Sequence, residues 1–315
     1  MPPMQKEEKQ DVKLEPALYV VATPIGNLGD VTECALRTLE FVDVVAAEDT
    51  RNTQSLLAHF GIKARMIAVH DHNERHAADG VVKLIGEGKS VALVTDAGTP
   101  AVSDPGARVV AAVHAARLKV VPVPGASAVV AAVSASGLWS EAGEGGFLFH
   151  GFLPTKSGDR KRALTTLLNC AYPIVLYESP HRIVESMADI ADVFGDTREI
   201  VVCRELTKKF ETIQRLALAD AVAWLEADSN QQRGEFVLVL SKPNQDGALE
   251  AKEAQTAMLE RTLRILLKDL PVKQAVALAV QLSGEKKNAV YDMALKIRDG
   301  VSGVSAPSNS EPPLL

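Results

Sequence analysis

Residues 23–30 read Thr-Pro-Ile-Gly-Asn-Leu-Gly-Asp, and residues 95–106 read Thr-Asp-Ala-Gly-Thr-Pro-Ala-Val-Ser-Asp-Pro-Gly. Each of these Gly/Pro-rich stretches follows a short β-branched apolar run, at 18–21 or 91–94, and leads into a predicted helix. An α/β sheet binds small ligands beyond the carboxyl ends of its strands, at turns of this kind. The two stretches, called here the first and second loop segments, therefore predict one composite ligand cleft.

Strands and helices alternate around the two loop segments, which predicts an N-terminal α/β domain over 18–124 with parallel strand pairs. Hydrophobic patterning predicts strands over 18–22, 43–47, 65–69, 91–95 and 119–123, and helices over 30–40, 50–59, 74–86 and 105–117.

The pattern changes after the Pro/Gly-containing stretch at 122–128, and we expect a mixed α/β domain over 125–242. Residues 250–298 carry helical periodicity and predict a small all-α module. The polar ends, 1–17 and 299–315, are predicted to be a disordered arm and tail.

Within the second domain we expect strands over 147–151, 173–178, 199–205, 211–217 and 235–240, and the third and fourth of these are expected to form a hairpin. We expect helices over 159–168, 180–194 and 218–226.

Composition favours a soluble cytoplasmic protein. The chain is 47% hydrophobic and 23% charged, and no apolar run approaches the roughly 20 residues that span a bilayer. Three scattered cysteines predict neither a disulfide framework nor a metal site. The net charge of −6 argues against an extended nucleic-acid surface but leaves room for a local one.

Two phosphate-binding patterns are disfavoured. Residues 86–90 contain Gly-Lys-Ser, but they lack the first glycine of a P-loop and precede a strand instead of a helix. The first loop segment lacks the glycine spacing of a dinucleotide fingerprint.

The stretch His70-Asp-His-Asn-Glu74 is compatible with a metal cluster, a polar functional loop or a plain solvated loop. Metal is the least favoured of these, because no other segment supplies an obvious fourth ligand.

Charged residues follow a second strand, where Glu48-Asp49-Thr50-Arg51 begins a helix. Asp49 either caps that helix or faces a ligand, and capping leaves the neighbouring Glu48 and Arg51 unexplained. Basic residues gather at three further places and predict a local anion-binding surface. These groups are Lys156, Arg160, Lys161 and Arg162; Arg204, Lys208 and Lys209; and Lys286 and Lys287.

Six segments in this order resemble the ribosomal RNA small subunit methyltransferase I family, of the tetrapyrrole-methylase-like superfamily of S-adenosylmethionine (SAM) enzymes. They are residues 22–32 around the first loop segment, Ala-Glu-Asp-Thr-Arg (47–51), His-Asp-His-Asn-Glu (70–74), the second loop segment, Pro-Val-Pro-Gly-Ala-Ser (122–127) and Tyr-Glu-Ser-Pro-His-Arg (177–182). The resemblance runs from about Leu18 to Leu240, and the helical module resembles the family's small extra domain.

The resemblance implies a two-domain enzyme that binds SAM between its domains and needs no metal. It implies methylation of the ribose 2′-oxygen of a cytidine in the decoding region of 16S rRNA, within the small ribosomal subunit, by a homodimer. The nearest alternative is a small-molecule, tetrapyrrole-like methyltransferase, and a non-catalytic nucleic-acid-binding protein is the third. Contacts with SAM are implied for Pro24, Ile25, Gly26, Asp96, Ala97, Gly98, Thr99, Val102, Ser103, Ser127, Ala128 and Tyr177.

A ribose hydroxyl is a weak nucleophile and benefits from a positioned base. Because acidic residues stand at the cleft end of a strand, Glu48 and Asp49 are the first candidates, and His72 or His70 comes next. RNA contacts are expected from the basic groups and the polar loops, namely from Arg51, Asn73, Arg160, Lys161, Arg162, Lys208 and Lys209.

Overall fold

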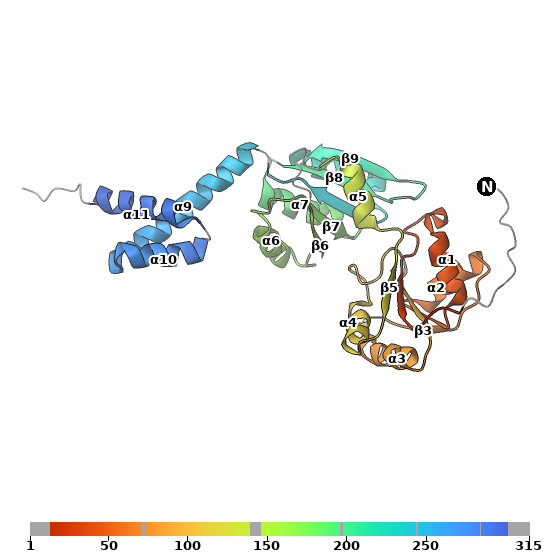
Figure 1. Ribbon diagram of the computed structural model, residues 1–315. Coiled ribbons are helices and arrows are strands. Elements are labelled where there is room, and N and C mark those ends of the chain that lie inside the picture. Colours follow the sequence, from red (N-terminus) through yellow and green to blue (C-terminus); the bar gives the residue numbers. More distant parts are fainter. Residues whose placement is uncertain are drawn as a thin grey trace, which may run out of the picture. The chain divides into compact units, whose positions relative to one another are not determined.

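The computed structural model describes residues 13–70, 73–138, 146–195, 198–243, 245–283 and 285–301, without the side chains of 245–255 and 299–301. The chain divides into two compact units, residues 1–242 and residues 243–315. The first unit contains two five-stranded sheets with helices, and the second is helical (Figure 1). This confirms the predicted α/β class with a C-terminal all-α module.

The first sheet is parallel throughout, in the order β3-β2-β4-β1-β5. Residues of β2 alternate between two cores, with Val45 and Ala47 on one face and Val44 and Ala46 on the other. Both faces are buried, as is typical of parallel sheets. The strands are β1 (Leu18–Val21), β2 (Val44–Ala47), β3 (Met66–Ala68), β4 (Val91–Val94) and β5 (Val120–Val123).

Two pairs of helices cover this sheet, one pair on each face (Figure 1). The predicted strands and helices of this domain are all present, but two helices begin later than predicted. The first begins at Glu33, because Thr32 is its cap and accepts the Ala35 N–H at 3.1 Å. The fourth begins only after Gly106, whose φ is +126°. The helices are α1 (Glu33–Phe41), α2 (Thr50–His59), α3 (Glu74–Gly86) and α4 (Ala107–Ala115).

The second sheet is mixed, in the order β6-β7-β10-β8-β9. Only β6 and β7 pair in parallel, and the antiparallel pairing of β8 with β9 confirms the predicted hairpin. Helices α6 (Ser157–Thr166), α7 (Ile183–Phe194) and α8 (Ala221–Ala227) contribute to the core on one face. The strands are β6 (Leu148–Phe152), β7 (Ile174–Glu178), β8 (Glu199–Arg204), β9 (Thr212–Ala217) and β10 (Phe236–Leu240).

The opposite face of the second sheet is covered by α5 (Ala128–Ser136), a helix that the sequence patterning did not predict. Its sequence, Ala-Val-Val-Ala-Ala-Val-Ser-Ala-Ser, is apolar almost all round, so it carries no polar stripe to reveal a helical period. The helix ends at Gly137, which adopts the left-handed conformation at φ +64°. It directly follows the 122–127 segment.

The helical unit consists of α9 (Gln245–Asp269), α10 (Val272–Ser283) and α11 (Lys287–Val301). They share a core that includes Leu263, Val276 and Val290. None of the helices in the described ranges combines the length and apolar character needed to cross a membrane.

The predicted arm and tail are only partly within the described residues. At the end of the arm, Ala17 is buried and Leu14 packs against the first core, because the chain enters β1 there. At the other end, α11 continues to Val301. Residues 1–12 and 302–315 lie outside the described ranges.

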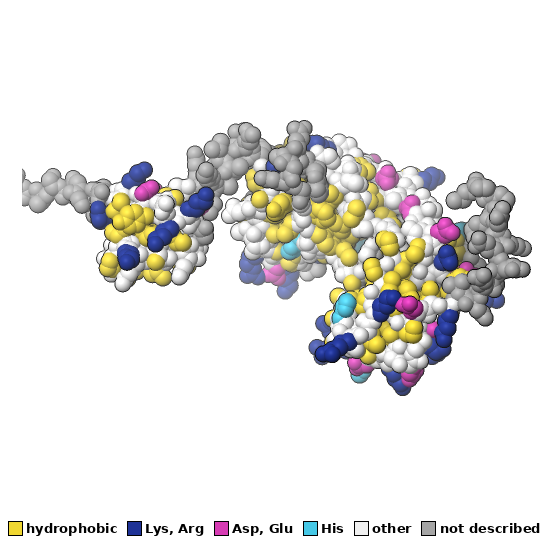
Figure 2. Space-filling view, in the orientation of Figure 1, with side chains coloured by type: hydrophobic (Ala, Val, Ile, Leu, Met, Phe, Trp, Pro, Cys, Tyr) yellow, Lys and Arg dark blue, Asp and Glu magenta, His cyan; other side chains and the backbone are white. Residues whose placement is uncertain are grey.

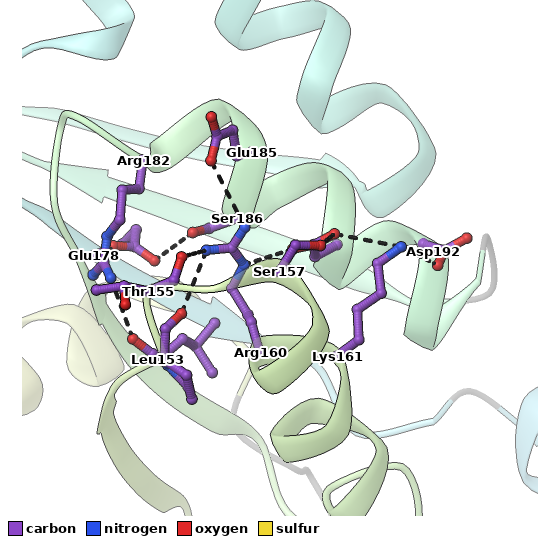
Figure 3. Close-up of polar contacts among 12 residues, drawn as sticks. Leu153, Thr155, Ser157, Arg160, Lys161, Glu178, Arg182, Glu185, Ser186 and Asp192 are labelled. Carbon is purple, nitrogen blue, oxygen red and sulfur yellow. Dashed lines mark hydrogen bonds and ion pairs between the residues drawn. The ribbon is translucent and has the colours of Figure 1, made fainter.

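A buried ion pair joins α6 to α7 (Figure 3). Arg160 is 1% exposed, and its Nε donates to Asp189 Oδ2 at 2.6 Å. Its Nη1 also donates to the carbonyls of Pro154 and Thr155, at 3.4 and 3.2 Å, in the chain leaving β6. The prediction that Arg160 contacts RNA is therefore wrong, because its guanidinium is enclosed by protein and holds the fold.

Removing the buried carboxylate should destabilise the protein strongly. We expect Asp189→Ala to lower the free energy of unfolding by about 3–5 kcal/mol, because it leaves Arg160 buried without its partner. The control is Asp192→Ala, which removes an exposed ion pair with Lys161 and should cost less than about 1 kcal/mol. Urea denaturation measures both, and equal losses would contradict the assignment.

The same pair predicts a pH dependence. Burial raises the pKa of Asp189, but hydrogen bonds from Arg160 and Ser157 outweigh it, and the pKa lies below its ordinary 3.8. The stabilisation is therefore complete above that ordinary value and is lost as the pH falls through the lowered one. Asp189→Asn should show a smaller acid-induced loss of stability than the parent protein.

Candidate functional site

The first and second loop segments lie side by side at the carboxyl ends of β1 and β4. Thr23 and Gly98 form a two-way bridge, in which the Thr23 N–H donates to the Gly98 carbonyl at 2.9 Å and the Gly98 N–H donates back at 3.1 Å. The Thr23 hydroxyl donates to the Thr95 carbonyl at 3.2 Å. The two segments that the sequence singled out therefore form one structure.

The 122–127 segment packs against the same structure and is hydrogen-bonded to it. The Thr99 hydroxyl donates to the Ala126 carbonyl at 3.1 Å. Gly125 approaches β1 so closely that a Cβ there would lie 3.0 Å from the Ala22 Cβ. In the second loop segment, Ala101 and Ser103 have φ values of +67° and +62°, which are uncommon for residues other than glycine. Backbone strain of this kind often accompanies functional sites.

These segments line a cavity of about 330 Å³ together with the second sheet. Its volume lies within the range of roughly 300–1,000 Å³ that is usual for small-molecule sites. The structure gathers there these residues of the predicted SAM set: Ile25, Ala97, Gly98, Thr99, Val102, Ser127, Ala128 and Tyr177.

The remaining four residues of that set lie elsewhere. Pro24, Gly26 and Asp96 line a second hollow, of about 360 Å³, beside α2. Ser103 points toward the second domain, where a Cβ at Gly151 would lie 2.7 Å from its Oγ. The two hollows share the loop segments, since residues of each segment line one hollow or the other: Ile25 lies in the first between Pro24 and Gly26 of the second, and 97–99 line the first after Thr95 and Asp96 of the second.

Sequence reasoning missed most of the wall that the second domain supplies. Most of these positions carry strand-like apolar residues, so nothing in the pattern separates them from the core. In that wall, the Glu178-Ser179-Pro180 stretch carried a signal, as part of a quoted motif. Asp104 was missed as well, although it lies in the second loop segment of the first domain. The missed lining residues are Asp104, Phe152, Glu178, Ser179, Pro180, Cys203, Leu206, Glu235, Phe236 and Val237.

The charge of the lining favours a cationic ligand. Asp104 and Glu235 are carboxylates, of which Glu235 is paired with Lys208, and none of the described residues that line the cavity is Lys, Arg or His. Glu178 is buried and already engaged, because it accepts a hydrogen bond from Arg182 (Figure 3) and one from the Ser179 N–H, each at 2.7 Å. Among these lining residues, a phosphate-bearing ligand would meet no positive side chain.

Two titratable groups in the cavity are neutral at physiological pH. Burial, with the negative charge of Asp104, raises the pKa of Tyr177 to about 12. Its ring packs against Phe149 and Phe152, with centroids 5.0 and 5.4 Å away. Burial also raises the pKa of the Cys203 thiol to about 12, so it is not a thiolate nucleophile.

The proposed bases differ in their surroundings. Asp49 caps α2, accepting the Arg51 N–H at 2.8 Å, and also pairs with the Arg51 guanidinium at 2.8 Å. These hydrogen bonds lower the pKa of Asp49 to about 2. Glu48 instead reaches the second loop segment, where its Oε2 accepts the Asp96 N–H at 3.3 Å. His72 lies outside the described residues.

The stretch around His70 supports the second loop segment. Glu74 is buried, and its Oε1 accepts the N–H groups of Gly106 and Arg108 at 2.9 and 3.0 Å, which caps the start of α4. Asn73, a predicted RNA contact, donates to the Ala68 carbonyl and accepts the His70 N–H. Its amide therefore closes the loop between β3 and α3.

The predicted RNA-binding cations are not equally available. Lys208 lies over the first loop segment, where a Cβ at Gly26 would lie 2.3 Å from its Cγ. Its Nζ pairs with Glu205 and Glu235, both at 2.8 Å.

Lys209 stands 5.5 Å above the Phe210 ring. The Arg51 side chain is 89% exposed, Arg162 is exposed beside Asp159, and Lys161 pairs with Asp192.

Among the described residues, no group of three or more His, Cys, Asp or Glu side chains is arranged to hold a metal ion.

Two family models match the chain. Residues 17–222 match "Tetrapyrrole (Corrin/Porphyrin) Methylases", and residues 253–298 match "RsmI C-terminal HTH domain". Similar solved structures include a uroporphyrin-III C-methyltransferase from Thermus thermophilus, at 20% identity with a TM-score of 0.52 over 72% of this chain and 94% of that one. The cobalt precorrin-4 methyltransferase is 21% identical, with a TM-score of 0.53 over 71% and 94%. These likenesses show a shared fold.

Curated relatives are much more similar in sequence. A protein of Vibrio cholerae is 48% identical over 89% of this chain and 95% of its own length. One from Escherichia coli O157:H7 is 45% identical over 89% and 94%, and one from Pseudomonas aeruginosa is 46% identical over 90% and 98%. All three are named ribosomal RNA small subunit methyltransferase I.

The buried cap at Glu74 leads to a stability prediction. Glu74→Ala should lower the free energy of unfolding by about 1–3 kcal/mol, because it leaves the buried Gly106 N–H unsatisfied. Glu87→Ala is the matched control, since Glu87 stands at the other end of α3 and makes only an exposed contact with Lys83. Comparable losses for both variants in thermal or urea unfolding would refute the capping role.

Proposed function

We propose that this chain, which belongs to the ribosomal RNA small subunit methyltransferase I family of tetrapyrrole methylases, methylates 16S rRNA with SAM as the donor. The acceptor that we propose is the ribose 2′-oxygen of a cytidine in the decoding region. The observation that carries the proposal is the identity of 45–48% with relatives of that name over nearly their whole length.

The first cavity suits SAM. The sulfonium of SAM is positive, and the carboxylate of Asp104 stands among described lining residues that include no basic side chain. During transfer, a lone pair of the 2′-oxygen forms the new C–O bond as the C–S bond breaks. S-adenosylhomocysteine then leaves with a neutral sulfur. The protein's main task is to hold oxygen, methyl carbon and sulfur in line.

The 2′-hydroxyl proton needs an acceptor, and Glu48 is a better candidate than Asp49. A carboxylate with a pKa of about 2, such as Asp49, is a weak base at neutral pH. Asp49 is also engaged by Arg51 and by its capping role. Glu48 contacts the second loop segment, whose neighbouring residues line both hollows.

Single-turnover assays with 30S subunits test this assignment. We expect Glu48→Gln to lower the rate constant by about 10²–10⁴-fold, the usual contribution of a general base. Asp49→Asn keeps a capping oxygen and should lower the rate by less than about tenfold. A Glu48→Gln variant with parent-like rates at saturating RNA would eliminate Glu48 as the base.

The RNA surface that we propose consists of Arg51, Lys161, Arg162 and Lys209, beside Asn73. On the visible face of the 1–242 unit, Lys and Arg side chains form small groups interspersed with acidic ones (Figure 2). A local surface of this kind positions RNA through its phosphates without specifying sequence. Lys208 contributes differently, because it fastens the β8–β9 hairpin to the first loop segment.

Salt dependence separates these roles. Lys209→Ala should reduce the slope of log affinity against log salt by about 0.7–0.9, the value for one lost phosphate contact. Lys89→Ala is the control. Lys89 precedes β4, so it stands at the amino ends of the strands of the first sheet, whereas the loop segments follow their carboxyl ends. An unchanged slope for Lys209→Ala in filter-binding titrations would remove the hairpin from the RNA surface.

One experiment tests the function as a whole. Labelled SAM is offered with 30S subunits, naked 16S rRNA or a porphyrinogen, and the acceptor that gains label is identified. We expect label in 16S rRNA, at a linkage resistant to alkali because its 2′-oxygen is blocked. Label in the porphyrinogen would favour a small-molecule methyltransferase, and the absence of transfer would favour a non-catalytic binding protein.

We further propose that the protein acts in the cytoplasm as a homodimer. Sedimentation equilibrium measures the assembly state, and a mass near 33.7 kDa would contradict a dimer.

A further inference from the structure

The second hollow, of about 360 Å³, lies against the same loop segments as the SAM cavity and has no role in the function proposed above. Its walls come from the two loop segments and α2. Pro24, Leu28 and Leu56 give it apolar surfaces, and the imidazole of His59 adds a flat ring. Flat and apolar surfaces of this kind stack nucleobases that have been turned out of a helix.

A side-chain pair supplies the polar part of the lining. Asn52 Nδ2 donates to Asp96 Oδ2 at 2.9 Å, and both residues line the hollow. Asn52 stands in the first turn of α2, which Asp49 caps, and the Asp96 N–H is held by Glu48. The pair is therefore mounted on fixed backbone and presents an amide donor next to a carboxylate acceptor.

This arrangement matches one edge of cytosine. Cytosine offers its N4 amino group as a donor, and its neighbouring N3 accepts. Asp96 can accept from N4, as acidic side chains do when they recognise cytosine, while Asn52 can donate its second amide hydrogen to N3. Uracil offers an acceptor and a donor in the reverse order, so its O4 would face the Asp96 carboxylate. Such repulsion is an efficient source of specificity.

We propose that the second hollow receives the acceptor base, and that Asp96 and Asn52 select cytosine over uracil. The proposal rests on the proposed function. It changes the role of Asp96, which the family resemblance implied to be a SAM contact. Neighbouring residues of the same loop segments line both hollows, and Glu48 accepts the Asp96 N–H, so a nucleobase held by Asp96 is bound next to the proposed general base and to segments that also line the SAM cavity. Enzymes that act on a nucleotide commonly read a turned-out base by its Watson–Crick edge.

The test compares 30S subunits that carry either cytosine or uracil at the methylated position. Methyl transfer from labelled SAM gives kcat/KM for each particle and hence a cytosine-to-uracil ratio. The parent protein should prefer cytosine by about tenfold or more. Asp96→Asn should shift the ratio toward uracil by at least about tenfold, because its amide can donate to O4. Asn52→Ala should also lower the ratio, by losing the contact with N3.

Asp104→Asn is the matched control, since it alters a carboxylate of the SAM cavity. It should raise the KM for SAM and leave the base ratio unchanged. An unchanged ratio in both Asp96→Asn and Asn52→Ala would overturn the base-reading site, as would a raised SAM KM as the sole effect of Asp96→Asn. If the parent protein methylates neither particle, the proposed function fails first and this proposal falls with it. Parent activity on cytosine with unchanged variant ratios refutes this proposal alone.

Discussion

Two backbone hydrogen bonds between Thr23 and Gly98 join the two loop segments that line the cleft. They are possible because β1 and β4 are neighbours in a parallel sheet, so the chain leaves both strands at the same edge. Gly98 has a φ of +80°, a conformation that glycine adopts without steric cost. The bridge joins the two turns into one structure, and residues of this structure line both hollows.

Several motifs that suggested chemistry act partly as scaffolding. Glu74 caps α4, and Glu178 is buried against Arg182 and Ser186. Arg160 holds the chain that follows β6, whose Phe152 lines the cavity. Charged side chains in such motifs fix the backbone around a site, because a buried hydrogen-bonded carboxylate tolerates little displacement. A motif alone does not separate these residues from those that touch the ligand.

The sequence predicted the strands of both sheets well, because buried β-branched runs bounded by Gly and Pro are a strong signal. Helix starts were less predictable, since Thr32 and Gly106 compete with nearby capping residues that look equally suitable. The helix at 128–136 was not predicted, because its sequence is apolar almost all round and shows no polar stripe, even though Val130 is exposed. In the cleft, the loop side was predictable from Gly and Pro, whereas Cys203, Phe236 and Val237 are chemically the same as core residues.

Gly26 and Lys208 come from different domains, yet they occupy one space. A Cβ at position 26 would lie 2.3 Å from the Lys208 Cγ, and Lys208 is fastened at its other end by Glu205 and Glu235. The side chains that fit at positions 26 and 208 therefore depend on each other. Any side chain at position 26 would require a shorter or redirected residue at 208, and Glu205 and Glu235 would then lose their ion pairs with Lys208.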